Sequence, residues 1–325
     1  MVRGITGEVA DAIYEKLAAF ANFGFPESHS VSFAYLVYAS SYLKRYFPAA
    51  FCAGLLDAQP MGFYAPHTLV ADARRHGVDV CTPDINLSIV GASLDWRGAP
   101  TTVDAFPIDG VDVAQPMVRL GLSSVRSVGD ALAAAIVDER VRNGDYRSID
   151  ELAHRVEVPR VALEALATAG AFEHCGTEPL DRRRALWSAG AAAQGGPDRL
   201  PGIVTGIEAP TLPGLSESEL GAADLWATGV APGRHPTVHL RAELDAMGVR
   251  TAVALRETVS GSRVLVGGVV THRQRPGTAK GVTFLNLEDE TGLINVICSP
   301  GLWQRHRRSS RPRCWCAVDW SGPRV

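Results

Sequence analysis

Apolar residues in the first part of the chain recur every three to four positions, which is the spacing of one helix face. This pattern predicts helices over residues 6–20, from 48 onward and over 66–76. Residues 30–46 differ, because apolar and aromatic side chains lie on every face of the predicted helix. We expect Ser28 to cap this helix, the protein interior to bury it all round, and the helix over 6–20 to pack on the same core.

Short alternating stretches predict strands near residues 78–80, 87–94 and 101–106, which would form a small β appendage. From residue 119 helical spacing returns, and residues 120–137 combine a short helix, a tight turn and a second helix, with a companion unit over 149–172. This arrangement resembles a helix-hairpin-helix, whose turn points backbone N–H groups at a DNA phosphate. Val128 and Gly129 are therefore candidate DNA contacts, and ordinary helix packing is the alternative.

Glycine and proline interrupt the pattern between residues 175 and 233, which predicts a linker with a brief helix over 181–187, followed by an amphipathic helix over 240–248. The last block alternates over 263–270, 281–289 and 293–298, and resembles the opening strands of an OB-fold, which commonly holds single-stranded nucleic acid. The basic loop in this block offers Arg273, Arg275 and Lys280 as candidate DNA contacts. Phe284 is either a stacking platform or a core residue.

Clustered carboxylates at Glu288, Asp289 and Glu290 invite a two-metal interpretation, because phosphoryl transfer uses such groups. They fall at a turn between strands, where solvated acids are expected, so we exclude a metal site there. The six cysteines show no Cys-x-x-Cys pair and no matching histidine spacing, which argues against zinc and favours free thiols in a reducing compartment.

The chain has 325 residues, enough for two or three domains, and a formal net charge of −3. Affinity for DNA must therefore come from local patches rather than from bulk charge. No apolar run reaches about 18 residues, and no basic-then-apolar segment opens the chain. We expect a cytoplasmic protein with no membrane partner.

The stretch Phe-Gly-Phe-Pro-Glu-Ser-His over residues 23–29, followed by Ser-Phe-Ala-Tyr-Leu-Val-Tyr-Ala-Ser, closely resembles the fingers region of the bacterial C-family DNA polymerases. Gln-Pro-Met-Gly-Phe-Tyr over 59–64 and Asp-Ala-Arg-Arg-His-Gly-Val over 72–78 resemble the error-prone, damage-induced paralogue of that family. The resemblance implies an α+β multidomain chain. Its expected parts are a mainly helical fingers segment with a small β appendage over 1–112, a helix-hairpin-helix module over 113–174, a Gly/Pro-rich linker over 175–256 and an incomplete OB-fold over 257–325.

The resemblance also implies DNA-templated nucleotidyl transfer with magnesium in replication and translesion repair synthesis. Its implied partners are template-primer DNA, deoxynucleoside triphosphates, and a sliding clamp or translesion accessory proteins. The family's catalytic aspartates would lie upstream of Met1, and no Asp-x-Asp occurs here, so we expect no catalytic residue, no bound metal and no polymerase activity from this chain alone.

Ser28 and His29, at the start of the helix over 30–46, are the candidate nucleotide contacts, because free N–H groups and the positive dipole end suit a triphosphate. Two alternatives to a polymerase part stay open: a stand-alone, non-catalytic helix-hairpin-helix and OB-fold DNA-binding module, and a non-functional gene remnant. Residues 305–313 are rich in arginine and serine, and no alternation continues the barrel from Cys314 onward. We therefore expect a truncated or frame-shifted OB-fold, with the reading frame lost between about 308 and 311.

Overall fold

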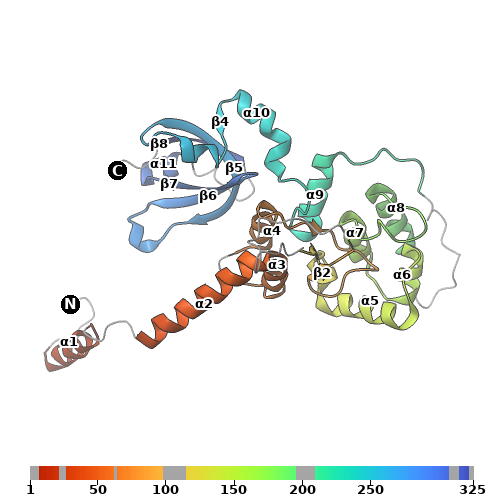
Figure 1. The fold of residues 1–325 in the computed structure, drawn as a ribbon, viewed down its shortest axis with the longest axis horizontal. Helices are drawn as coiled ribbons and strands as arrows, with labels where there is room; N and C mark the ends of the chain where they lie inside the picture. Colours follow the sequence, from red (N-terminus) through yellow and green to blue (C-terminus); the bar gives the residue numbers. More distant parts are fainter. Residues whose placement is uncertain are drawn as a thin grey trace.

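The computed structural model describes residues 7–21, 27–61, 64–97, 115–194, 209–306 and 315–321. It is an α+β structure, as predicted. Figure 1 shows two N-terminal helices that extend away from the body, a group of helices at the opposite end of the molecule, and a curled β-sheet formed by the C-terminal part.

The described α-helices are α1 Glu8–Ala21, α2 Glu27–Tyr46, α3 Pro48–Asp57, α4 Pro66–Arg75, α5 Gly129–Asn143, α6 Ile149–Arg155, α7 Arg160–Thr168, α8 Arg182–Ala192, α9 Glu217–Thr228, α10 Arg241–Ala246 and α11 Pro300–His306. The strands are β1 Val80–Cys81, β2 Ser93–Asp95, β3 Met117–Arg119, β4 Val249–Arg250, β5 Arg263–Gln274, β6 Thr283–Asp289, β7 Gly292–Cys298 and β8 Trp315–Ser321. Short 3-10 helices are η1 Leu122–Ser124, η2 Pro236–Leu240, η3 Ala254–Glu257 and η4 Gly277–Ala279.

Helix α2 is exposed, although its sequence predicts burial on every face. Its large apolar residues include Tyr35 and Tyr38, which are 72% and 73% exposed. Only its C-terminal end reaches the body, where it packs on α3, so no described element covers the rest (Figure 1). Helix α1 likewise exposes its apolar stripe, with Val9 and Leu17 on the surface, and the expectation that it packs on a shared core is wrong for the described residues.

The start of α2 also differs from the prediction. The helix begins at Glu27, so Ser28 lies in its first turn instead of capping it, and the Ser28 carbonyl accepts a hydrogen bond from Ser32 Oγ at 2.9 Å. The Gly/Pro turn expected just before it, at residues 22–26, lies outside the described residues. Pro48 and Pro66 do begin the next two helices, as predicted, because proline fits the first helical position.

A three-stranded sheet in the order β1-β3-β2 joins α3 and α4 around a small core that includes Val70, Val78 and Val118. The strands predicted near 78–80 and 87–94 correspond to β1 and β2, which are shorter and begin at higher residue numbers than predicted. The prediction missed the central strand β3, since three residues are too few to show alternation. The strand expected over 101–106 lies outside the described residues.

The main helical core is built by α5 to α9. Helix α7 is its centre, and Leu163 and Leu166 there are fully buried between α8 and α9. Helix α9 lies inside the segment whose composition predicts a linker, and the sequence pattern did not reveal it. A capping box starts this helix, because the Ser216 side chain accepts from the Glu219 N–H while Glu219 bonds back to the Ser216 N–H.

The C-terminal sheet has five strands in the order β4-β5-β6-β7, with β8 also paired to β5. A β-bulge between Val270 and His272 bends β5, the longest strand. At Gly268 the backbone approaches so closely that an added Cβ would lie 2.6 Å from the Glu288 carbonyl oxygen. The expectation that residues from 314 onward do not continue the sheet is wrong for β8, which pairs with β5 from Arg263↔Ser321 to Val269↔Trp315.

Candidate nucleic-acid interface

The turn before α5 holds the two backbone groups predicted to contact phosphate. Ser127 and Gly129 have φ angles of 65° and 63°, a left-handed conformation in which glycine is the strain-free residue. The Val128 N–H already donates to the Val125 carbonyl at 3.1 Å, and the Val128 side chain is buried. Gly129 is the first residue of α5, so its N–H lies at the positive end of the helix dipole without an intrahelical acceptor. Of the two amides, Gly129 is the one placed to receive an anion.

Arg126 lies immediately before this turn, and the sequence pattern did not single it out. Its N–H donates to the Ala227 carbonyl at 2.7 Å, and its guanidinium lies 5.1 Å from the centre of the Trp226 ring. These contacts attach the end of α9 to the hairpin turn. The signal in the sequence was weak, because Trp226 lies in a segment of linker-like composition, far from Arg126 in the chain.

A second basic group lies on the β5–β6 hairpin. Arg273, Arg275 and Lys280 all belong to this hairpin and its η4 loop, and all three are exposed. The Arg273 guanidinium lies 5.6 Å from the Trp303 ring centre, and Lys280 adopts a left-handed conformation with φ 47°. The fold therefore gathers the three predicted cations on one loop, where they can follow a phosphate backbone.

Ser28 and His29 lie apart from both groups. They belong to the first turn of α2, at the end that points away from the body, and both are exposed (Figure 1). The His29 ring packs edge-on against Phe33, with 4.5 Å between ring centres. The structure brings Ser28 and His29 together with each other, and not with the hairpin turn or the β5–β6 loop.

Two acids of the triplet at the β6–β7 turn are buried and the third, Glu290, is half-buried, which corrects the expectation of solvated acids. Glu288 and Asp289 are 1% and 0% exposed. Glu288 pairs with Arg75 of α4 at 3.0 Å, and burial raises its pKa against the opposing effect of that arginine. An Asp289 oxygen accepts the Ala252 N–H at 2.7 Å, and Glu290 pairs with Arg241 at 2.6 Å. Burial is tolerated because each carboxylate has donors.

Within the described ranges, no group of three or more His, Cys, Asp or Glu side chains is placed to hold a metal ion. The carboxylates of the triplet are engaged by arginines and N–H donors, so their arrangement does not fit magnesium. Cys52, Cys81, Cys175 and Cys298 are free thiols, and burial raises the pKa of Cys52 to about 12. None of the described helices is long and apolar enough to cross a membrane.

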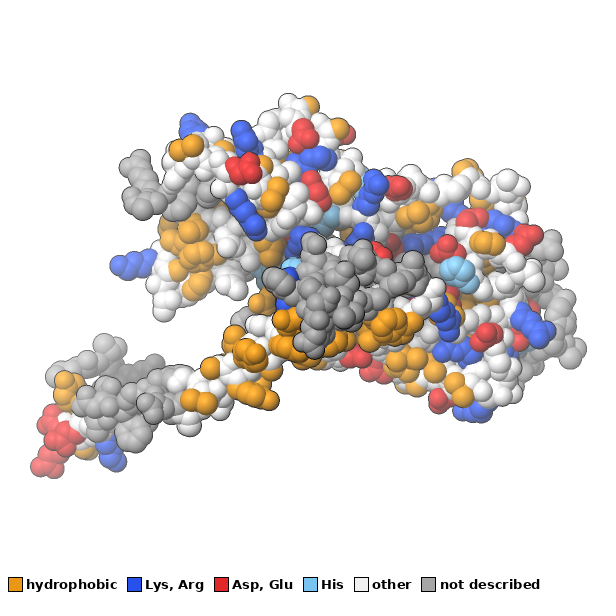
Figure 2. All heavy atoms as spheres, viewed as in Figure 1, with side chains coloured by type: hydrophobic (Ala, Val, Ile, Leu, Met, Phe, Trp, Pro, Cys, Tyr) orange, Lys and Arg blue, Asp and Glu red, His pale blue; other side chains and the backbone are white. Residues whose placement is uncertain are grey.

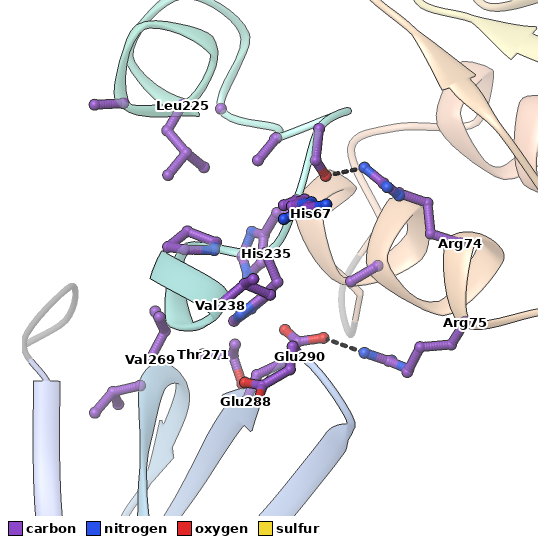
Figure 3. Close-up of a pocket in the computed structure, with 18 of the residues that line it drawn as sticks. His67, Arg74, Arg75, Leu225, His235, Val238, Val269, Thr271, Glu288 and Glu290 are labelled. Atoms are coloured by element: carbon purple, nitrogen blue, oxygen red, sulfur yellow. Dashed lines mark hydrogen bonds and ion pairs between the residues drawn. The ribbon is translucent and has the colours of Figure 1, made fainter. Parts of the chain in front are cut away.

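A cavity of about 690 Å³ lies where α4, α9, η2, the second half of β5 and the β6–β7 turn meet (Figure 3). Arg74 and Arg75 of α4 point toward it, and Arg74 donates a hydrogen bond to the Gly233 carbonyl. His235 lines the same space, and its burial lowers its pKa to about 4, although Glu290 and Asp289 oppose this effect. His235 is therefore neutral near pH 7.

Comparison with known proteins gives two results. Residues 77–185 match the helix-hairpin-helix motif family. Over 94% of its length the chain is 57% identical to the error-prone DNA polymerase of Nocardia farcinica and 55% identical to that of Mycobacterium tuberculosis strain H37Rv. The corresponding protein of Corynebacterium glutamicum is 46% identical over 95% of the chain. The chain spans about a quarter of the length of these curated relatives, from 26% to 27%.

Proposed function

We infer that this chain, which is homologous over nearly its whole length to a segment of the error-prone DNA polymerases of the bacterial C family, is the DNA- and nucleotide-contacting C-terminal part of such an enzyme. The observation that carries the inference is the 57% identity over 94% of the chain. The proposed role is in DNA replication and translesion repair synthesis in the cytoplasm, with a sliding clamp or translesion accessory protein as a further partner.

The proposed DNA contacts are to phosphates and therefore do not depend on the base sequence of the DNA. The Gly129 N–H binds a phosphate at the hairpin turn, while the buried Val128 side chain holds that turn in place. Arg273, Arg275 and Lys280 bind further phosphates from the β5–β6 loop, which we assign to an OB-fold on the support of the curled five-stranded sheet.

Nucleotidyl transfer belongs, in this proposal, to the longer enzyme. Ser28 and His29 contact the triphosphate of the incoming nucleotide there, which their exposed position at the start of α2 permits. Magnesium would be held by carboxylates outside this chain, since the buried acids at the β6–β7 turn are already engaged. The chain alone is therefore expected to be inactive in primer extension with magnesium.

Binding of a fluorescent primer-template over a salt series tests the DNA contacts. The triple variant R273A/R275A/K280A should bind more weakly, and the slope of log K against log salt should fall by roughly one for each phosphate that the loop no longer binds. Arg256→Ala, which changes an exposed arginine of η3 outside that loop, is the matched control and should keep the wild-type slope. Equal slopes for wild type and the triple variant would contradict the assignment.

A stand-alone DNA-binding module is the second candidate, and one observation favours it: the helical core and the C-terminal sheet each have a buried cluster of their own. The exposed apolar surface of α2 favours the polymerase part instead, because a free-standing module gains nothing from it. Primer extension after mixing with the remaining part of a relative distinguishes the two, since only the polymerase part should support it.

A further inference from the structure

The cavity between α4, α9 and β5 has an aromatic and aliphatic wall. Leu225 of α9 lies across the cavity from Val238 of η2 and Val269 of β5 (Figure 3), and Trp226 of α9 also lines this volume of about 690 Å³. Trp226 is 48% exposed, so a large part of its indole surface is open to a ligand. A flat, partly open aromatic ring in an apolar cavity is a surface on which a nucleobase can stack.

Basic and acidic side chains both line this cavity, and among the described residues one of the arginines forms no ion pair. Arg75 is neutralised by Glu288 at 3.0 Å, and Arg234 lies 3.8 Å from Glu217. Among the residues that the structure describes, no carboxylate lies within ion-pair distance of Arg74, which instead donates to the Gly233 carbonyl, and Asp79 acts on it only from farther away. A partly buried guanidinium that lacks a contacting counter-ion has most to gain from an anionic ligand.

The cavity also lies between the two proposed DNA contacts. On one side, the guanidinium of Arg126, which lies beside the hairpin turn, is 5.1 Å from the centre of the Trp226 ring. At the other side Thr271 lines the cavity, and the same strand leads directly to Arg273. A DNA strand that runs from the hairpin turn to the β5–β6 loop can therefore pass the cavity mouth.

We propose that this cavity takes one unpaired nucleotide of single-stranded DNA, with its base stacked on Trp226 and its phosphate at Arg74. The proposal rests on the proposed function, because it takes the strand to be the one held by the hairpin turn and the β5–β6 loop. The charge of Arg74, for which the described part of the chain supplies no ion pair, favours a polyanion over an apolar peptide as the occupant.

Binding of a fluorescent oligo-dT of about ten nucleotides to the full chain tests the site. Trp226→Ala should weaken binding at least about fivefold, since base stacking of this kind contributes that much or more, whereas Trp226→Phe keeps a flat ring and most of the affinity. Arg74→Gln should lower the salt slope by about 0.7, the value for one phosphate contact on a single strand. Trp187→Ala on α8 is the control, because Trp187 is 50% exposed and lies outside the cavity.

Two further comparisons keep the result clear. Wild type should show more tryptophan quenching by oligo-dT than Trp226→Phe, because this variant keeps a flat ring at the site and lacks the indole fluorophore. Unchanged oligo-dT affinity in both Trp226→Ala and Arg74→Gln would overturn the proposal and leave the cavity to an apolar peptide. If R273A/R275A/K280A still bound oligo-dT more weakly in that case, the proposed function would stand without the site.

Discussion

Helices α2 and α7 are both rich in apolar residues, and the structure treats them in opposite ways. In α7, Leu163 and Leu166 are 0% exposed, because α8 and α9 of the same chain pack over them. In α2, Leu36 and Val37 are 59% and 60% exposed, and Figure 2 shows hydrophobic side chains along this projecting helix. The apolar content of a helix therefore does not by itself show whether other elements of the same chain bury it.

The two helices differ in whether described elements of this chain cover their apolar side chains. In the described part of the chain, α8 and α9 pack on α7 and bury its leucines. Helix α2 is apolar on every face. A helix of this kind is normally buried on all sides, so a single docking groove would not cover it. The chain matches about a quarter of the length of the relatives, which therefore contain further sequence.

The largest expected difference is in the stability that two ion pairs contribute, one buried in the helical core and one exposed beside α2. Arg182 and Asp224 join α8 to α9 at 2.6 Å, with side chains only 13% and 7% exposed. Asp224→Ala leaves a buried guanidinium unpaired and should cost roughly 3–5 kcal/mol of unfolding free energy. Lys44 and Asp72, an exposed pair between α2 and α4, should contribute less than about 1 kcal/mol in Asp72→Ala. Urea unfolding of both variants measures the two losses of unfolding free energy. Equal losses would contradict the expected difference between the buried and the exposed pair.

Matched leucines sharpen the same comparison. Leu166→Ala in α7 should destabilise the protein by about 2–5 kcal/mol, because it leaves a cavity in a close-packed core. Leu36→Ala in α2 removes an exposed side chain and should change stability by less than about 0.5 kcal/mol. Denaturant midpoints report both values. A large loss for Leu36→Ala would mean that α2 is already covered within this chain.

Acid should weaken the junction between η2 and the sheet more than it affects α2. His235 has an ordinary value of 6.5 and a pKa of about 4 in the fold, so protons bind the unfolded chain first as the pH falls. The contribution of neutral His235 to the free energy of unfolding is fully present above pH 6.5. It is lost as the pH falls from 6.5 to 4, by up to roughly 3 kcal/mol. His235→Asn keeps the cap that accepts the Thr237 N–H and does not titrate.

Thermal unfolding of wild type and His235→Asn at several pH values between 7 and 4 measures this loss. The variant should lose less stability than wild type over that window. Identical pH profiles would show that His235 does not couple folding to pH.

Much of the fold could be predicted because the signals were local. Pro48 and Pro66 begin α3 and α4, and the alternation in the last block fell on β5, β6 and β7. The resemblance to error-prone polymerases was confirmed by the relatives. Helix α9 was missed since Gly and Pro dominate its surroundings, and its position beside α8 depends on the tertiary Arg182–Asp224 pair.

The candidate site was less predictable, because its groups come from distant parts of the chain. The hairpin turn and the basic loop were predicted as segments, but nothing local places Trp226 beside Arg126. The burial of Glu288 depends on Arg75, 213 residues away in sequence. Ser28 and His29 stay predictions, as do the phosphate roles of Gly129 and the β5–β6 loop.

Hydrogen exchange of α2, with and without the remaining part of the Nocardia farcinica relative, tests the central claim most directly. In the chain alone, α2 amides should exchange close to the rate of a fraying helix while α7 amides stay protected, because only α7 is packed. Adding the rest of the polymerase should slow exchange in α2 at least about tenfold and leave α7 unchanged. Protection of α2 equal to that of α7 in the chain alone, or no change on addition, would contradict the assignment of this chain as part of a larger polymerase.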